Sequence, residues 1–304
     1  MIRNRISVII PYKEPAPFLK ETLKSLKSQS IYPDLDIIVI KDNGNGVSAT
    51  RNRGLRNVKG EFIYFIDADD VLANKDVLGK ARDVLICNKE LDFLYGDMII
   101  SDEQLQAIEY QRTPLFHGEH LSDYLIHGGA IMLQSMLFRN NNGEVWFDQQ
   151  YKMQEDLDYI LRRTYKRTGL HIGRPFIIYR KHADSLTQKR EPNKADEIIK
   201  TMQIYRNFLL ANPELIRNKV YFKKIIVKQS LIRIHILHTF YYRKEALALL
   251  LKIMKYFPLI ISKKFLRVVM EFFIPAFLAK IIRVLFKKIK KIRYQSKNTY
   301  EVLI

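Results

Sequence analysis

The first hundred residues alternate short apolar runs with segments in which apolar residues recur every three or four positions. Short apolar runs are typical of buried strands, and the wider spacing is typical of amphipathic helices. The apolar runs occupy residues 6–10, 36–40, 62–66 and 93–95, and the helical segments occupy 18–26, 48–58 and 74–90. Strands joined through helices pair by right-handed crossovers. The sequence therefore predicts an α/β fold, a Rossmann-like and mostly parallel sheet with helices on both faces.

The rest of the chain is less regular and then becomes helical. Residues 115–150 contain loop signals, a helix is expected over 154–167, and a further strand over 176–179. From about residue 193 the spacing indicates only helices. We therefore expect an α/β domain over residues 1–192 and a helical region over residues 193–304.

Polar residues follow each of the first three predicted strands. These segments are residues 11–14, 41–43 and 67–70. Binding sites in parallel sheets lie beyond the carboxyl ends of the strands. We expect the three segments to meet at one rim of the sheet.

The last of these segments contains Asp67, Asp69 and Asp70. Carboxylate oxygens are the ligands that Mg²⁺ and Mn²⁺ prefer, and such ions take further ligands from substrate phosphates. The cluster is therefore a candidate metal-diphosphate site. Its alternative interpretation is a solvated turn, because Asp is common in turns.

Missing motifs narrow the function further. No glycine-rich dinucleotide motif follows the first strand and no phosphate-binding P-loop motif occurs in the chain, which argues against a nicotinamide enzyme and a P-loop NTPase. The single cysteine, Cys87, excludes a disulfide scaffold and a cysteine-based zinc site, and it suits a reducing compartment. Residues 1–5 do not resemble a signal peptide, so we expect a cytoplasmic protein.

The net charge of +19 is concentrated near the carboxyl terminus. Residues 201–304 contain 22 Lys and Arg but only 4 Asp and Glu. A nucleic-acid-binding protein would carry positive charge and stacking aromatic residues on its folded domain. The balanced charge of residues 1–200 argues against that class, and we expect no nucleic-acid partner.

The basic region also has an amphipathic pattern. Cationic residues at spacings of three and four run beside an apolar stripe: Lys280, Arg283, Lys287 and Lys291 beside Phe277, Ile281, Leu285 and Ile289. Its charges make it unsuitable for spanning a bilayer. The pattern is typical of a helix lying on an anionic membrane surface. The alternative is a helical subdomain with a solvated basic face.

Six ordered motifs resemble those of the family 2 glycosyltransferases, which have the GT-A fold. The motifs are SVIIPY (7–12), IVIKDNG (38–44), ATRNRG (49–54), FIDADD (65–70), QED (154–156) and YRKH (179–182), and the resemblance covers residues 6–188. It implies an inverting enzyme that moves a sugar from a UDP-sugar to a hydroxyl of a growing cell-surface glycan or glycolipid, of the lipooligosaccharide, O-antigen or capsule type, with Mn²⁺ or Mg²⁺. It also implies a nucleotide-sugar half over about 1–100 and an acceptor half over about 101–192.

The resemblance assigns donor-binding roles to residues on the predicted rim. The implied donor-binding residues are Pro11, Tyr12, Glu14, Asp42, Arg51, Asp67 and Asp69. Asp42 matches the aspartate that recognises uracil, although Lys41 replaces the aspartate that usually precedes it. Asp69 is the implied metal ligand, Asp67 contacts the ribose or sugar, and Asp70 supports them.

Asp156 is implied to be the catalytic base that takes the acceptor hydroxyl's proton. A carboxylate near the positive end of a helix stays ionised, which suits that role. The alternative interpretation of Glu155 and Asp156 is favourable charge in the first turn of a helix. His127, Gln134 and Ser135 lie where the family places its acceptor-side wall.

His182 follows Arg180 and Lys181 in the last motif. This positive cluster is a candidate site for the departing diphosphate, and His182 is a candidate metal ligand. The alternative role for His182 is that of a hydrogen-bonded polar residue.

Other functions compete with sugar transfer. A sugar-phosphate nucleotidyltransferase has a similar core but should carry a glycine- and arginine-rich loop after the first strand, where this chain has Tyr12, Lys13 and Glu14. The leading hypothesis is a glycosyltransferase held peripherally on the inner face of the cell membrane.

Overall fold

The computed structural model describes residues 1–115, 117–118, 121–126, 129–140, 145–183, 185, 194–215, 219–239 and 242–254. The chain forms two compact units. One comprises Met1–Lys189 with Gln203–Ala211, and the other comprises Arg190–Met202 with Asn212–Ile304. The first unit contains the sheet, and the described part of the second is helical.

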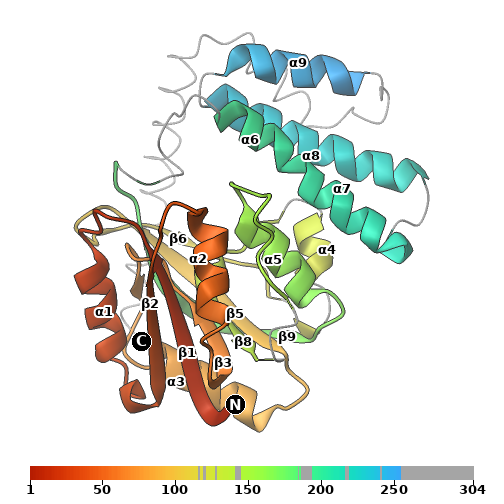
Figure 1. Cartoon of the computed structure of the whole chain (residues 1–304). Helices are drawn as coiled ribbons and strands as arrows, with labels where there is room; N and C mark the ends of the chain where they lie inside the picture. Colours follow the sequence, from red (N-terminus) through yellow and green to blue (C-terminus); the bar gives the residue numbers. More distant parts are fainter. Residues whose placement is uncertain are drawn as a thin grey trace, which may run out of the picture. The chain divides into compact units, whose positions relative to one another are not determined.

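The first unit is organised around one mixed sheet (Figure 1). Its strands in spatial order are β2 (Leu35–Lys41), β1 (Ile2–Tyr12), β3 (Gly60–Phe65), β8 (Met136–Arg139), β5 (Phe93–Ser101), β9 (Gly169–Arg180) and β4 (Val71–Leu72). In addition, β6 (Ala107–Gln111) pairs with β5 and β7 (His117–Gly118) pairs with β9. β1 pairs in parallel with both β2 and β3, and β5 pairs in parallel with β9. The predicted parallel core is confirmed.

One face of the sheet packs on α1 (Leu19–Lys27) and α3 (Val77–Cys87). Val8 and Tyr64 of neighbouring strands belong to the same fully buried hydrophobic cluster as Leu26 of α1. Residues two apart on a strand share a face, so this cluster accounts for alternate positions of β1 and β3.

The opposite face packs on α2 (Gly46–Leu55) and α5 (Glu155–Thr164) (Figure 1). A side chain on Gly54 of α2 would lie 2.5 Å from the Cγ2 atom of Ile9, so the absence of one lets the helix approach β1 closely. Tyr159 of α5 packs edge-on against Phe65 of β3, with ring centroids 5.4 Å apart. Helices therefore cover both faces of the sheet, as predicted.

Two local expectations differ from the structure. The irregular segment 115–150 contains β8, which lies antiparallel between β3 and β5 in the middle of the sheet. The same segment includes α4 (Leu121–Ile126) and a short 3-10 turn, η2 (Leu133–Ser135). The helix expected from residue 48 begins at Gly46, where Asp42 Oδ1 accepts the backbone N–H of Gly46 at 3.1 Å.

The described helices after the sheet are α6 (Lys194–Lys200), α7 (Met202–Ala211), α8 (Lys219–Thr239) and α9 (Arg243–Met254). Within the second unit, α8 packs against both α6 and α9. Among the described residues, no helix is long and apolar enough to cross a bilayer. The basic stripe predicted around residues 277–291 lies outside the described residues.

Candidate active site

The acidic cluster follows β3 at the rim of the sheet. Carboxylate oxygens of Asp67, Asp69 and Asp70 lie within 4.8 Å of one another. Asp70 is completely buried, whereas the side chains of Asp67 and Asp69 are 32% and 33% exposed. Burial and the neighbouring carboxylates raise the pKa of Asp69, and they raise the pKa of Asp70 well above its ordinary value. The cluster is therefore a place where a cation would be favoured.

Asp70 anchors the cluster to the fold. Its Oδ1 atom accepts the backbone N–H of Arg180 at 3.0 Å, and its backbone carbonyl accepts the Thr22 hydroxyl at 2.8 Å. These bonds join the end of β3 to β9 and to α1. Asp70 serves the site by fixing the loop that carries Asp67 and Asp69.

Arg51 of α2 connects the cluster to the amino-terminal turn of α5. Its side chain is 4% exposed, and its two terminal nitrogens lie 2.8 Å from Asp67 Oδ1 and 2.7 Å from Glu155 Oε1. Burial alone would lower the pKa of Arg51, but the surrounding carboxylates outweigh that effect and raise it. Arg51, predicted to contact the donor, is thus engaged with two carboxylates beneath the rim.

Glu155 and Asp156 begin α5 beside Arg51. Burial raises the pKa of Glu155 to about 7, and the Arg51 charge opposes that rise. Burial also raises the pKa of Asp156, again against Arg51, and one Asp156 oxygen accepts the N–H of Leu157 at 2.8 Å. Asp156 therefore combines an elevated proton affinity with a nearby positive charge, which suits a group that must be ionised and then accept a proton.

His182 faces the cluster from the segment after β9. Its Nε2 atom lies 2.9 Å from Asp69 Oδ2, and its ring packs edge-on against Phe18 with centroids 5.0 Å apart. The structure brings together Asp69 and His182, the two residues predicted to bind metal.

Asp42 lies at the amino terminus of α2. Its Oδ1 atom accepts the N–H groups of Gly44 and Gly46 at 3.1 Å each and lies 3.3 Å from the Thr50 hydroxyl. All three of these contacts use the same carboxylate oxygen. The backbone N–H of Asp42 donates to the carbonyl of Tyr12, which ties the ends of β1 and β2 together.

The remaining predicted donor residues lie at the end of β1. Pro11 is buried in register with Ile40 of β2, and Tyr12 is partly exposed. Glu14 is exposed and pairs with Lys41 at 2.7 Å. Lys41, which replaces the expected aspartate, is therefore held by a carboxylate of the neighbouring strand end.

Comparisons with known proteins show which proteins this chain is similar to. The model of "Glycosyl transferase family 2" matches residues 42–85, which include α2, β3 and the acidic cluster. An uncharacterised glycosyltransferase of Methanocaldococcus jannaschii is 21% identical over 79% of this chain and 91% of its own length. In sequence, the chain is similar to glycosyltransferase family 2.

Two further comparisons extend this result. A GalNAc(5)-diNAcBac-PP-undecaprenol beta-1,3-glucosyltransferase of Campylobacter jejuni is 24% identical over 58% of this chain and 64% of its own length. The crystal structure of S. aureus TarS 1–349 in complex with UDP-GlcNAc superposes with a TM-score of 0.50 and 17% identity, covering 81% of this chain and 89% of that one. For two Rickettsia relatives the match spans 56% of their length. The GT-A fold and the glycosyltransferase class, both predicted from the motifs, are confirmed.

The structure gives two residues of this candidate site contacts that the sequence did not predict. Gln134 of η2 donates through its side-chain amide to Asp67 Oδ2, and Arg180 lies directly beneath the cluster. The sequence placed Gln134 on an acceptor-side wall and Arg180 in a cluster for the diphosphate. His127, the other wall residue considered, lies outside the described residues.

Glu155→Gln should change how the stability of this glycosyltransferase depends on pH. The pKa of Glu155 is about 7 in the folded state and 4.5 ordinarily, so the folded state binds this proton more tightly. Proton binding to Glu155 therefore stabilises the folded state. This contribution is complete below about pH 4.5 and is lost as pH rises through about 7. Between pH 5 and pH 8, the urea-measured free energy of unfolding should fall for the wild type relative to the variant by about 2 to 3 kcal/mol. A difference that does not vary with pH would contradict this.

Proposed function

We propose that this enzyme transfers a sugar from a UDP-sugar to a hydroxyl of a growing cell-surface glycan by a single, metal-assisted displacement with inversion. The observation that carries the proposal is the ion-paired chain Asp67–Arg51–Glu155, which joins the acidic rim to the helix that carries Asp156. The complex of TarS with UDP-GlcNAc supports the choice of donor class. The Campylobacter jejuni glucosyltransferase, whose name specifies an undecaprenol-linked glycan, supports a lipid-linked glycan as acceptor.

The hydrogen bonding of Asp42 supports a uracil base. Because Oδ1 already accepts from Gly44 and Gly46, Oδ2 is the better placed oxygen for a ligand. Uracil presents one ring N–H, whereas guanine presents two adjacent N–H donors that call for both oxygens of a carboxylate. We therefore expect UDP to bind more tightly than GDP.

The residues of the acidic cluster fit a divalent cation. Both oxygens of Asp67 are engaged, one by Arg51 and one by Gln134, whereas the contact of Asp69 with His182 uses only Oδ2. Asp69 and His182 would hold Mn²⁺ or Mg²⁺, and the ion would supply charge neutralisation for the departing diphosphate. The contact between His182 Nε2 and Asp69 Oδ2 would be replaced by contacts with the ion.

Asp156 supplies the proton chemistry. As the acceptor oxygen forms its bond to the anomeric carbon, Asp156 takes the hydroxyl proton, and the bond from that carbon to the diphosphate oxygen breaks to release UDP. Inversion in one step needs no covalent sugar intermediate. Burial raises the pKa of Asp156, and the Arg51 charge opposes that rise, which favours the ionised form that a base requires.

Asp156→Asn should reduce turnover by at least about a hundredfold while leaving donor binding intact, because it removes the base without changing the shape of the residue. Turnover is measured with each candidate acceptor, and donor binding by calorimetry with UDP and GDP. Asp158→Asn is the matched control, since Asp158 lies on the same helix but pairs with Arg162. Loss of UDP binding in Asp156→Asn, or equal activity in both variants, would argue against the base assignment.

Asp69→Asn should weaken Mn²⁺ binding by about tenfold or more, because one negative ligand is lost. The free Mn²⁺ signal in electron paramagnetic resonance measures this without substrate. Asp83→Asn, an exposed carboxylate on α3, controls for general charge effects. Unchanged Mn²⁺ affinity in Asp69→Asn would remove Asp69 from the metal site.

We also propose that the second unit binds an anionic membrane surface, which would place the enzyme on the inner face of the cell membrane. On α9, Leu247, Leu251 and Met254 are between 42% and 65% exposed, and Lys244 and Lys252 flank them. Ala246, Leu249, Leu250 and Ile253 are buried on the opposite side of the same helix. Exposed apolar residues bordered by lysines match the chemistry of an anionic lipid interface.

Replacing Leu247 and Leu251 together by Ser should weaken binding to phosphatidylglycerol vesicles by about tenfold or more, because less apolar surface enters the interface. Leu210→Ser, which changes an exposed leucine on α7, is the matched control. Co-sedimentation with anionic and neutral vesicles measures the binding. Equal binding by both variants would exclude α9 as the contact, and a change of oligomeric state alone would indicate that a second copy covers this face.

A further inference from the structure

Arg180 occupies an unusual position for a charged residue. It is the last residue of β9, and its side chain is 1% exposed although it lies beside the acidic rim. Its Nε atom donates to the carbonyl of Asp69 at 2.9 Å, one terminal nitrogen pairs with Glu21 at 2.7 Å, and the other donates to the carbonyl of Glu103. One guanidinium therefore joins three segments that are distant in the sequence.

These partners make Arg180 unsuitable for the diphosphate role considered from the sequence. All three of its side-chain nitrogens donate to protein groups, and its guanidinium carbon lies 4.3 Å from the centre of the Phe18 ring. A buried guanidinium that gives up such bonds leaves several polar groups unsatisfied. Its charge is directed into the fold.

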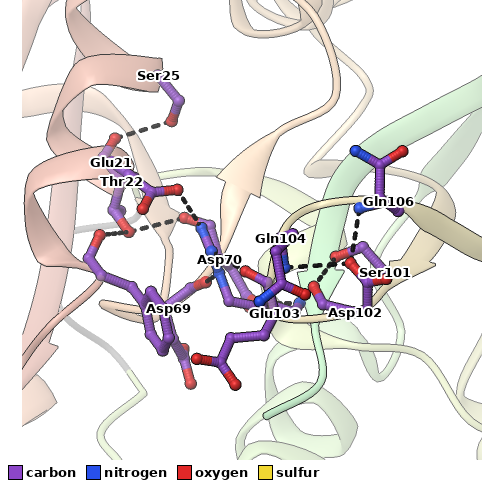
Figure 2. A network of polar contacts seen from close by, with 12 residues as sticks. Glu21, Thr22, Ser25, Asp69, Asp70, Ser101, Asp102, Glu103, Gln104 and Gln106 are labelled. Atoms are coloured by element: carbon purple, nitrogen blue, oxygen red, sulfur yellow. Dashed lines mark hydrogen bonds and ion pairs between the residues drawn. The ribbon is translucent and has the colours of Figure 1, made fainter.

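The segments that Arg180 holds are themselves braced. Figure 2 shows Glu21, Asp69 and Asp70 in one polar network with the turn after β5. In that turn, Asp102 Oδ1 accepts the N–H groups of Gln104 and Gln106 at 3.1 and 2.8 Å. Arg180 thus ties the main chain of Asp69 to a fixed turn on one side and to α1 on the other.

The same contacts orient His182. The Phe18 ring packs with its face toward the Arg180 guanidinium and meets the His182 ring edge-on at 5.0 Å. Arg180 precedes His182 by two residues in the chain, and the backbone N–H of Arg180 donates to Asp70. The Arg180 side chain therefore contacts the main chain of Asp69 directly and His182 indirectly, through the Phe18 ring.

We propose that Arg180 is a positioning residue for sugar transfer, which presents the Asp69 carboxylate and the His182 imidazole to the same cation. The inference rests on the proposed metal site. Residues behind metal ligands orient them, and losing such a residue typically costs 10- to 100-fold in metal affinity. Lysine keeps the charge of Arg180 but cannot make three separate bonds in a fork.

The test compares Arg180→Lys with Arg139→Lys. Arg139 is also a largely buried arginine with several partners, donating to the carbonyls of Leu85 and Leu91, but it lies away from the rim beside α3. The Mn²⁺ affinity of the full chain is measured by electron paramagnetic resonance without substrate, and the melting temperature is measured alongside it. We expect Arg180→Lys to weaken Mn²⁺ binding about 10- to 100-fold. Arg139→Lys should leave the Mn²⁺ affinity within about twofold of the wild type, even if it lowers the melting temperature as much as Arg180→Lys does.

The outcomes separate this inference from the metal site itself. If Asp69→Asn loses Mn²⁺ affinity while Arg180→Lys retains it, the metal site stands and the positioning role is wrong. If Mn²⁺ affinity falls equally in both arginine variants, the effect is general destabilisation and the role is also wrong. If the wild type binds no Mn²⁺, both proposals fail. If Arg180→Lys does not fold, the Mn²⁺ affinity of Glu21→Gln is measured instead. This variant removes only the half-exposed ion pair between Glu21 and Arg180 and should also weaken Mn²⁺ binding; an unchanged affinity would contradict the positioning role.

Discussion

Crowding of negative charge is the constraint on which this structure depends. Asp67, Asp69 and Asp70 follow β3, and Glu155 and Asp156 begin the helix beside them. Carboxylates brought together in a partly buried place repel one another and resist ionisation, which is why burial and neighbouring charge raise pKa values here. Two buried arginines lie beside these carboxylates, Arg51 on α2 and Arg180 at the end of β9. Arg51 pairs with Asp67 and Glu155, whereas Arg180 pairs with Glu21 and donates to the backbone carbonyl of Asp69.

Stacked aromatic side chains lie beneath the Arg51 guanidinium. Its guanidinium lies over the Phe147 ring at 5.3 Å, and that ring stacks on Tyr159 of α5 with centroids 4.1 Å apart and planes 6° apart. Burying the charge of an arginine in such surroundings costs free energy unless both carboxylate partners are in place. The orientation of α5, and with it the position of Asp156, is therefore coupled to the same contacts that hold Asp67.

The sequence is informative where a property repeats along the chain and uninformative where it depends on a distant partner. Apolar runs ending in polar residues were sufficient to predict that the segments after β1, β2 and β3 would meet. Periodicity could not reveal β8, because four residues in an irregular segment become a central strand only by pairing with β3 and β5. Likewise, nothing near Arg180 in the sequence indicates that its partners are Glu21 and Glu103.

The two arginines also show why the order of motifs indicates which residues lie together but does not indicate the role of each residue. A motif marks a residue that the site requires, but a required residue can face the ligand or face the protein. Arg51 and Arg180 both belong to such motifs, yet the terminal nitrogens of both donate to carboxylates or carbonyls of the fold. Because Arg51 contacts the turn that carries the proposed base, and Arg180 the segment that carries the proposed metal ligand, we expect replacing either to disturb the proposed chemistry indirectly. Contact geometry, which only the three-dimensional structure supplies, distinguishes these two kinds of requirement.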